Sequence, residues 1–212
     1  MGSVEKISQS NVYNIIRHDE RLNQNYSNAD IDLSRKNLDY VISPNRGMSN
    51  YDYYKQRLNE CYLYNREDVK TIFSWVITCP EDVTKEDEDL FFYNVYDFLC
   101  ERYGEENCVS ATVHKDESGR PHMHFLSIPV VEDKKHEQGE KVCMNDVINR
   151  KELRNFHPDL DKFLKNRGMN CAVYTGITRK NGGNMTVKQL KAEREMKQEV
   201  QQKRERKWEH VV

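Results

Sequence analysis

The feature that most constrains the fold of this chain is a pair of apolar runs joined by a short turn. Residues 108–114 and 122–131 are rich in β-branched and aromatic residues, which favour strands. Between them stand residues 118–121, Ser-Gly-Arg-Pro, a sequence typical of a turn. The two runs therefore predict neighbouring antiparallel strands. Pro129, late in the second run, predicts that this strand lies at an edge of the sheet.

The rest of the chain alternates between strand and helix patterns. Further strands are predicted at residues 4–7, 71–79 and 171–174, and helices at residues 10–21, 51–64, 84–103, 153–164 and 186–209. Residues 23–39 are rich in Asn, Asp and Ser and predict an irregular loop. This order predicts an α+β fold in which an antiparallel sheet is covered by helices, with a charged helix at the C-terminal end.

Gly182 and Gly183 predict a hinge before the last helix. With 212 residues in all, the chain is expected to form one domain over residues 1–184 and a charged helix over residues 185–212. That helix has little apolar surface, so we expect it to dock loosely or to continue into a further region.

Composition excludes several classes of protein. No apolar run approaches the roughly 18 residues that a membrane helix needs, and the start has no apolar signal region. The six cysteines form no C-x-x-C pair, which excludes a zinc finger and disfavours a disulfide framework. The expected location is the cytoplasm.

Charge is unevenly distributed along the chain, although the formal net charge is only −2. Residues 61–140 carry 8 basic and 18 acidic groups, whereas residues 141–212 carry 17 basic and 9 acidic groups. A segregated field of this kind can present a basic face to a polyanion such as nucleic acid. A solvated charged helix would give the same composition.

Three histidines are concentrated at the predicted hairpin. His122 and His124 alternate along a strand, so both side chains lie on one face, about 7 Å apart. The turn brings His114 beside them. Three neutral imidazoles, with Glu117 in the intervening turn, are the donor set of an open metal site. Affinity favours Zn²⁺, Ni²⁺ or Cu²⁺ there, whereas phosphate chemistry commonly uses Mn²⁺ or Mg²⁺.

A second group of polar residues ends the first predicted helix. His18 and Arg21 are three residues apart and therefore share a helix face. An arginine beside a nucleophile suits phosphodiester chemistry, because charge on the phosphoryl oxygens must be stabilised during attack. Alone, these residues also describe an ordinary charged helix end.

These motifs together resemble those of a known family. His114, followed by the His-Met-His sequence at 122–124, resembles the histidine–hydrophobic–histidine motif of HUH endonucleases. The sequences Arg-His-Asp-Glu-Arg at 17–21, Ser-Asn-Ala-Asp-Ile at 27–31 and Asn-Leu-Asp-Tyr at 37–40 are similar to the opening motif of MobV-type plasmid relaxases, the Mob/Pre family. That motif reads roughly H-N-E-R, S-N-x-D-I and N-Y.

The resemblance implies an HUH relaxase fold and a metal-dependent single-stranded DNA endonuclease and strand transferase. Such enzymes nick an origin of transfer on a plasmid or mobile element, stay attached to the 5′ phosphate and so start conjugative mobilisation. Residues 1–184 would be the catalytic domain. His114, His122 and His124 would bind a divalent ion, Mn²⁺ ahead of Mg²⁺, Zn²⁺ or Ni²⁺, and Glu117 would complete or orient the site. No nucleotide or organic cofactor is implied.

By position, the resemblance makes His18 the nucleophile and places Arg21 on the scissile phosphate. Tyr26 and Tyr40 remain alternative nucleophiles. Asp19 stands where the family usually has Asn, which adds negative charge beside His18 and is expected to raise its pKa.

The implied partner is single-stranded DNA at a hairpin-flanked origin of transfer, with a coupling protein in the full system. Basic, aromatic and amide side chains are candidates for DNA contacts: Arg17, Tyr26, Asn28, Tyr40, Arg120, Arg179 and Lys180. Two alternatives remain. A rolling-circle initiator of the HUH type normally carries a tyrosine on a helix after the hairpin, but none stands between His124 and Tyr174. A metal-stabilised DNA-binding module would lack catalysis.

Overall fold

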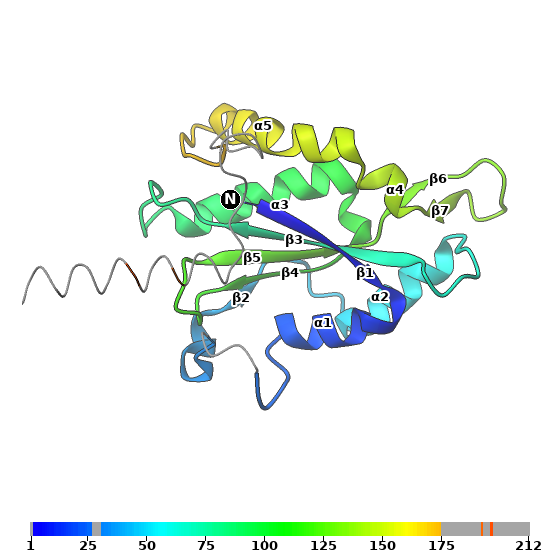
Figure 1. Ribbon diagram of the computed structural model, residues 1–212, viewed down its shortest axis with the longest axis horizontal. Helices are drawn as coiled ribbons and strands as arrows, with labels where there is room; N and C mark the ends of the chain where they lie inside the picture. The colour runs from blue at the N-terminus through cyan, green and yellow to red at the C-terminus, as the bar shows by residue number, and fades with distance from the viewer. Residues whose placement is uncertain (1, 27–30, 175–191, 193–195, 197–212) are drawn as a thin grey trace, which may run out of the picture. The chain divides into compact units, whose positions relative to one another are not determined.

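The computed structural model describes residues 2–26, 31–174, 192 and 196 (Figure 1). Its five-stranded antiparallel sheet has the strand order β1-β3-β5-β4-β2. The strands are β1 (Gly2–Ser8), β2 (Tyr40–Val41), β3 (Lys70–Thr78), β4 (Cys108–His114) and β5 (His122–Ser127). A separate two-stranded hairpin pairs β6 (Val130–Glu132) with β7 (Glu140–Val142). The α+β class expected from the sequence is confirmed.

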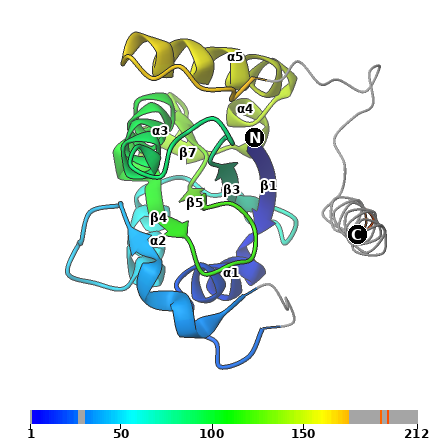
Figure 2. The same ribbon diagram turned by 90° about the vertical axis from the view of Figure 1, so that its left-hand side faces the viewer.

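Helices lie on both faces of the sheet (Figure 2). One face carries α3 (Glu88–Tyr103), the short α4 (Met144–Val147) and α5 (Arg150–Asn166), and the other carries α1 (Val12–Asp19) and α2 (Asn50–Glu60). Three short 3₁₀ helices cover residues 9–11, 33–38 and 105–107.

Each face of the sheet has its own apolar core. On the α3 and α5 side, Trp75 stacks on Phe156 with ring centroids 3.6 Å apart, and both are buried. On the α1 and α2 side, Val12 and Ile16 of α1 pack with Leu126 of β5 in a smaller cluster. The spacing of Val12 and Ile16 by four residues puts them on one helix face, which explains how so short a helix docks.

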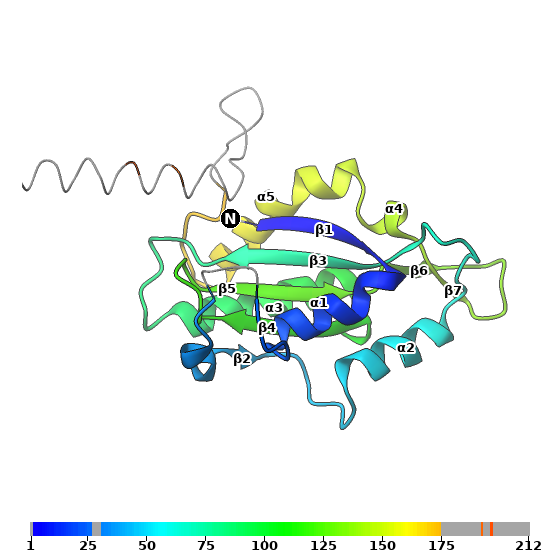
Figure 3. The same cartoon turned by 60° about the horizontal axis from the view of Figure 1, so that its bottom comes forward.

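The strand patterns account for these two cores. Along β5, Met123 and Phe125 are fully buried in the cluster beneath α3, whereas His122 and His124 point to the other face. Figure 3 shows α1 lying across that other face, over β4 and β5. Alternation in one strand therefore separates the core from a row of histidines.

The structure corrects several predicted boundaries. The run at 122–131 is split, because β5 ends at Ser127 and the chain continues into the separate strand β6. Pro129 therefore lies outside β5, and β5 is a central strand rather than an edge strand. Residues 171–174 form no strand; Cys171 and Val173 are instead buried against the larger core. Strands β2 and β7 were not predicted.

The predicted C-terminal helix and the boundary at residue 184 lie outside the described residues. Among the helices that the structure describes, none is long and apolar enough to cross a membrane.

Candidate metal centre and active site

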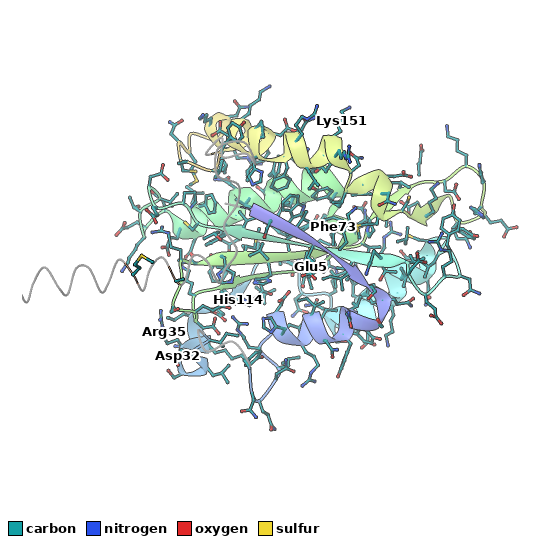
Figure 4. The ribbon with its side chains drawn as sticks, in the orientation of Figure 1. Glu5, Asp32, Arg35, Phe73, His114 and Lys151 are labelled. Atoms are coloured by element: carbon teal, nitrogen blue, oxygen red, sulfur yellow. The ribbon has the colours of Figure 1, made fainter. Side chains whose placement is uncertain are left out.

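The three predicted histidines meet on the sheet face beneath α1. One ring nitrogen from each of His114, His122 and His124 can be chosen so that all three lie within 4.8 Å of one another. His114 ends β4 and pairs directly with His122 at the start of β5. Figure 4 labels His114 at this end of the sheet. The hairpin register therefore produces the cluster that the sequence predicts.

The second ring nitrogen of two of these histidines is fixed by the backbone. His114 Nε2 lies 2.8 Å from the carbonyl oxygen of Asp19, and His122 Nδ1 lies 3.2 Å from that of Arg120. Because a carbonyl oxygen only accepts, each of these nitrogens carries the proton. The opposite nitrogen then presents a lone pair, and that of His114, Nδ1, is buried with no hydrogen-bond partner in the described part of the chain. Such lone pairs are suited to a metal ion.

Protonation states also suit a metal. Burial, helped by the nearby His124, lowers the pKa of His114 to about 3, and burial lowers that of His122. Both rings are therefore neutral near pH 7, as metal ligands must be. Burial alone would lower the pKa of His124, but the carboxylates of Asp19 and Glu117 outweigh it and raise that pKa above its ordinary value.

Asp19 joins the end of α1 to the histidine cluster at two points. Its carbonyl accepts from His114, and its Oδ1 lies 3.2 Å from His124 Nδ1 without hydrogen-bond alignment. The side chain is only 1% exposed. A buried carboxylate next to a ligand imidazole orients the ring and increases its basicity. The residue that departs from the family pattern thus lies in the site itself.

A second, acidic group adjoins the first. Ligand atoms of His114, Asp116 and Glu117 also lie within 4.8 Å of one another. Arg21 donates from Nε and Nη2 to both oxygens of Asp116, each at 2.7 Å, and from Nη2 to Glu117 Oε1 at 2.8 Å. Burial would raise the pKa of Asp116, but Arg21 holds it below its ordinary value.

This arrangement corrects the predicted role of Arg21. The side chain is 1% exposed and its donors are directed at carboxylates, so it does not present itself to a phosphate. It holds Glu117, whose Oε1 lies 3.8 Å from His122 Nε2. Arg21 is therefore a positioning residue.

The backbone at Arg21 is unusual in a way that supports this role. The N–H groups of Arg21 and Leu22 donate to the carbonyls of His18 and Arg17, which is the hydrogen-bond pattern of a Schellman motif. Glycine is usual at the left-handed position of that motif, but Arg21 occupies it with φ of 53°. A non-glycine residue pays about 1–2 kcal/mol there. The buried ion pairs with Asp116 and Glu117 hold it in place.

His18 lies on α1 directly before the residue that contacts the cluster. Its ring meets that of Tyr26 edge to face, with centroids 5.4 Å apart. Burial lowers the pKa of His18, assisted by Arg21 and His124, although Asp19 acts in the opposite direction. The expectation that Asp19 leaves this pKa raised is therefore wrong, because desolvation outweighs the charge. His18 is neutral near pH 7.

Other predicted site residues are placed differently. Tyr40 pairs with Val113 and lies on the α3 face, where its hydroxyl donates to Asp89 at 2.8 Å. Tyr40 therefore packs on the face opposite the histidines. Burial and Asp89 raise its pKa, so its hydroxyl is not activated as a nucleophile. Arg120 donates to the carbonyls of Cys79 and Pro80 and so connects the hairpin turn to the segment after β3.

Arg17 donates from Nε to Asn23 Oδ1 and from Nη2 to the carbonyl of Leu22, so it closes the turn after α1. Asn28, Arg179 and Lys180 lie outside the described residues. The DNA contacts assigned to these side chains remain predictions.

Sequence reasoning missed two acidic residues of this site. Asp116 is fully buried against Arg21, and Asp39 Oδ1 accepts from the backbone N–H groups of Lys115 and Asp116 at 2.7 and 3.0 Å. The Asp-Glu pair in the hairpin turn was a usable signal for Asp116. Asp39 is distant in sequence, and only the pairing of β2 with β4 brings it there.

Comparison with solved structures identifies the class of fold. The structure is similar to the MobM relaxase domain (MOBV; Mob_Pre) solved with plasmid pMV158 oriT DNA and manganese. The TM-score is 0.72 at 27% sequence identity, over 91% of this chain and 97% of that chain. The fold is thus that of a relaxase domain.

The family model for plasmid recombination enzymes (Mob_Pre) matches residues 1–192, and the chain belongs to this family. A plasmid recombination enzyme of Lactiplantibacillus plantarum is 30% identical over 92% of this chain and 54% of its own length. One from Streptococcus agalactiae is 29% identical over 96% of this chain and 41% of its own length. The chain spans about half the length of these relatives.

Proposed function

We propose that this domain is a divalent-metal-dependent DNA relaxase that nicks one strand at an origin of transfer on a plasmid or mobile element. The observation that carries the proposal is the three-histidine cluster at the end of α1, where Asp19, directly after a neutral His18, contacts His114 and His124. The MobM relaxase domain, solved with oriT DNA and manganese, supports the substrate class and the metal.

In this proposal, His114, His122 and His124 hold the ion, with Mn²⁺ favoured over Mg²⁺, Zn²⁺ or Ni²⁺. The unpartnered buried nitrogen of His114 and the neutral rings of His114 and His122 fit a divalent ion. When bound, the ion supplies positive charge that polarises a phosphoryl oxygen and stabilises the charge developing on it. Glu117, fixed by Arg21, orients the cluster from the side of His122.

His18 supplies the nucleophile. A lone pair on its neutral imidazole forms a bond to phosphorus while the bond from phosphorus to the 3′ oxygen breaks. The other ring nitrogen loses its proton and the 3′ oxygen takes one up, so the step balances. The product is a phosphoramidate that joins the protein to the 5′ phosphate and can be reversed by a 3′ hydroxyl. This reaction needs no nucleotide cofactor. Tyr26, whose ring contacts His18, is the competing nucleophile.

The wider setting follows from the family. A hairpin-flanked origin of transfer, start of conjugative mobilisation, a coupling protein in the full system and a cytoplasmic location are parts of the same proposal. Arg17, Tyr26, Asn28, Arg179 and Lys180 remain candidates for DNA contacts.

The test is covalent capture. The protein is incubated with a randomised single-stranded DNA pool and Mn²⁺, and the products are separated on a denaturing gel. We expect an adduct that chelator abolishes and that His18→Ala lacks, while His136→Ala, a change beside Asp133 in the β6–β7 connection, forms it normally. Binding without any adduct would favour a non-catalytic DNA-binding module.

A further inference from the structure

A groove of about 360 Å³ lies between the strand β1 and helix α1, and His18 is one of its lining residues. Its walls include Glu5, Asn11, Asn14, Ile15, His18 and Lys70. The metal cluster, Arg21 and the acidic pair do not line it. The mechanism above uses only His18 from this set.

Local structure explains why these side chains converge. Asn14 and His18 are four residues apart on α1, and Asn11 stands directly before the helix, one turn before Asn14, so the three follow one helix face. Glu5 alternates with Lys6 along β1; Lys6 points to the other side of the sheet and donates to the Ile148 carbonyl. Figure 4 labels Glu5 on β1, which is an edge strand of the sheet.

Several polar side chains of this groove are free to bind a ligand. The side chains of Asn11, Asn14 and Glu5 are exposed and make no hydrogen bond or ion pair within the residues that the structure describes. Ile15 is half-buried between them and offers an apolar surface. An edge strand on one side leaves the groove accessible along its length.

The chemistry of the groove fits a nucleobase better than a phosphate. Lys6 also lines the groove, but its ammonium donates to the Ile148 carbonyl on the other side of the sheet. The remaining charged pair, Lys70 and Glu5, gives no net positive charge that would favour a phosphate group. A carboxamide both donates and accepts, which suits the edge of adenine, and a carboxylate accepts from the amino group of cytosine. An aliphatic side chain can lie against the face of an unpaired base.

We propose that this groove is a base-reading subsite, which selects the identity of an unpaired nucleotide next to the cleaved phosphate. The inference rests on the proposed function, because it places the phosphate at His18. Asn14 is the principal reading residue, since it lies one helical turn from His18. Asn11 and Glu5 complete the contacts with the base edge.

The test uses the whole chain and the same randomised single-stranded DNA pool with Mn²⁺. Captured strands are sequenced, which gives the base preference at each position around the nick. We expect Asn14→Ala to reduce the preference at one position beside the nick by about ten- to a hundredfold, the range for loss of a bidentate base contact. Asn11→Ala and Glu5→Gln should weaken the same position less. Asn65→Ala, an exposed change between α2 and β3, is the matched control and should leave every position unchanged.

The outcomes separate this inference from the function on which it rests. An adduct whose base preferences are unchanged in all three groove variants would overturn the subsite and leave the relaxase proposal standing. A uniform loss of adduct, with the preferences preserved, would also overturn base reading. No adduct from the wild-type protein would overturn the proposed function and the subsite together.

Discussion

The two faces of β5 are built for different tasks. Met123 and Phe125 point into a core where apolar contact is the whole environment, whereas His122 and His124 point to a face crowded with carboxylates and an arginine. On the first face burial stabilises the fold. On the second face burial leaves polar nitrogens and oxygens without partners, which costs stability and prepares a site. One strand therefore carries the two kinds of residue in strict alternation.

The largest expected effect is on the site face. His122→Ala should lower the rate of adduct formation about a thousandfold or more, since it removes a proposed metal ligand. Thermal stability in chelator should be preserved, because the lost group is a buried polar one. In Mn²⁺ the wild-type protein should gain about 2.7 kcal/mol at a hundredfold excess over Kd, and the variant should gain less. A large fall in stability of the variant in chelator would show that this histidine is structural.

Substitutions on the α3 face of β5 should lower stability, and this loss should not depend on metal. Phe125→Ala is expected to lower the free energy of unfolding by about 3–5 kcal/mol, because it opens a cavity in the core beneath α3. Denaturant titration measures this loss. It should be the same in Mn²⁺ and in chelator once metal binding to the folded state is subtracted. A Phe125→Ala variant with unchanged stability but reduced Mn²⁺ binding would contradict the separation of the two faces.

Substitutions at Arg21 and at its partner Asp116 test the link between the end of α1 and the histidine cluster. Asp116→Asn removes the charge that pairs with Arg21 and should lower metal affinity or nicking about 10- to 100-fold, as is usual when an outer partner of a ligand is lost. Arg21→Gly relieves the left-handed backbone but removes the ion pairs with Asp39, Asp116 and Glu117, so it should also lose affinity. Calorimetric titration with Mn²⁺ measures both. Unchanged Mn²⁺ affinity in Arg21→Gly would show that Arg21 only ends helix α1 and does not position the site.

The pH dependence is the smallest effect and the most specific. Attack requires neutral His18, and burial lowers its pKa below the ordinary value of about 6.5. In saturating Mn²⁺, where the raised pKa of His124 does not limit metal binding, the rate should therefore stay level as pH falls to 6.5 and decline only at lower pH. Asp19→Asn removes a charge that raises the pKa of His18, so it should move the decline to still lower pH. A decline that begins above 6.5 would contradict this assignment.

The sequence allowed the hairpin, the three histidines and the α+β class to be predicted, because alternation and turn residues act locally. It did not show where Arg21 points. That depends on Asp116, which is 95 residues away and reaches Arg21 only after α1 has docked on the sheet. Tyr40 was misjudged for a similar reason, since the face it occupies is decided by the two-residue pairing of β2 with β4. Long-range pairing leaves no periodic signal in the chain.

The most direct test of the central claim is identification of the residue that becomes attached to DNA. The adduct formed in Mn²⁺ is digested and its peptide–nucleotide linkage mapped by mass spectrometry, with acid treatment as a check on the bond type. The account predicts an acid-labile phosphoramidate on His18, absent from His18→Ala. An acid-stable phosphotyrosine on Tyr26, or cleavage to a free 5′ phosphate with no linkage, would contradict it.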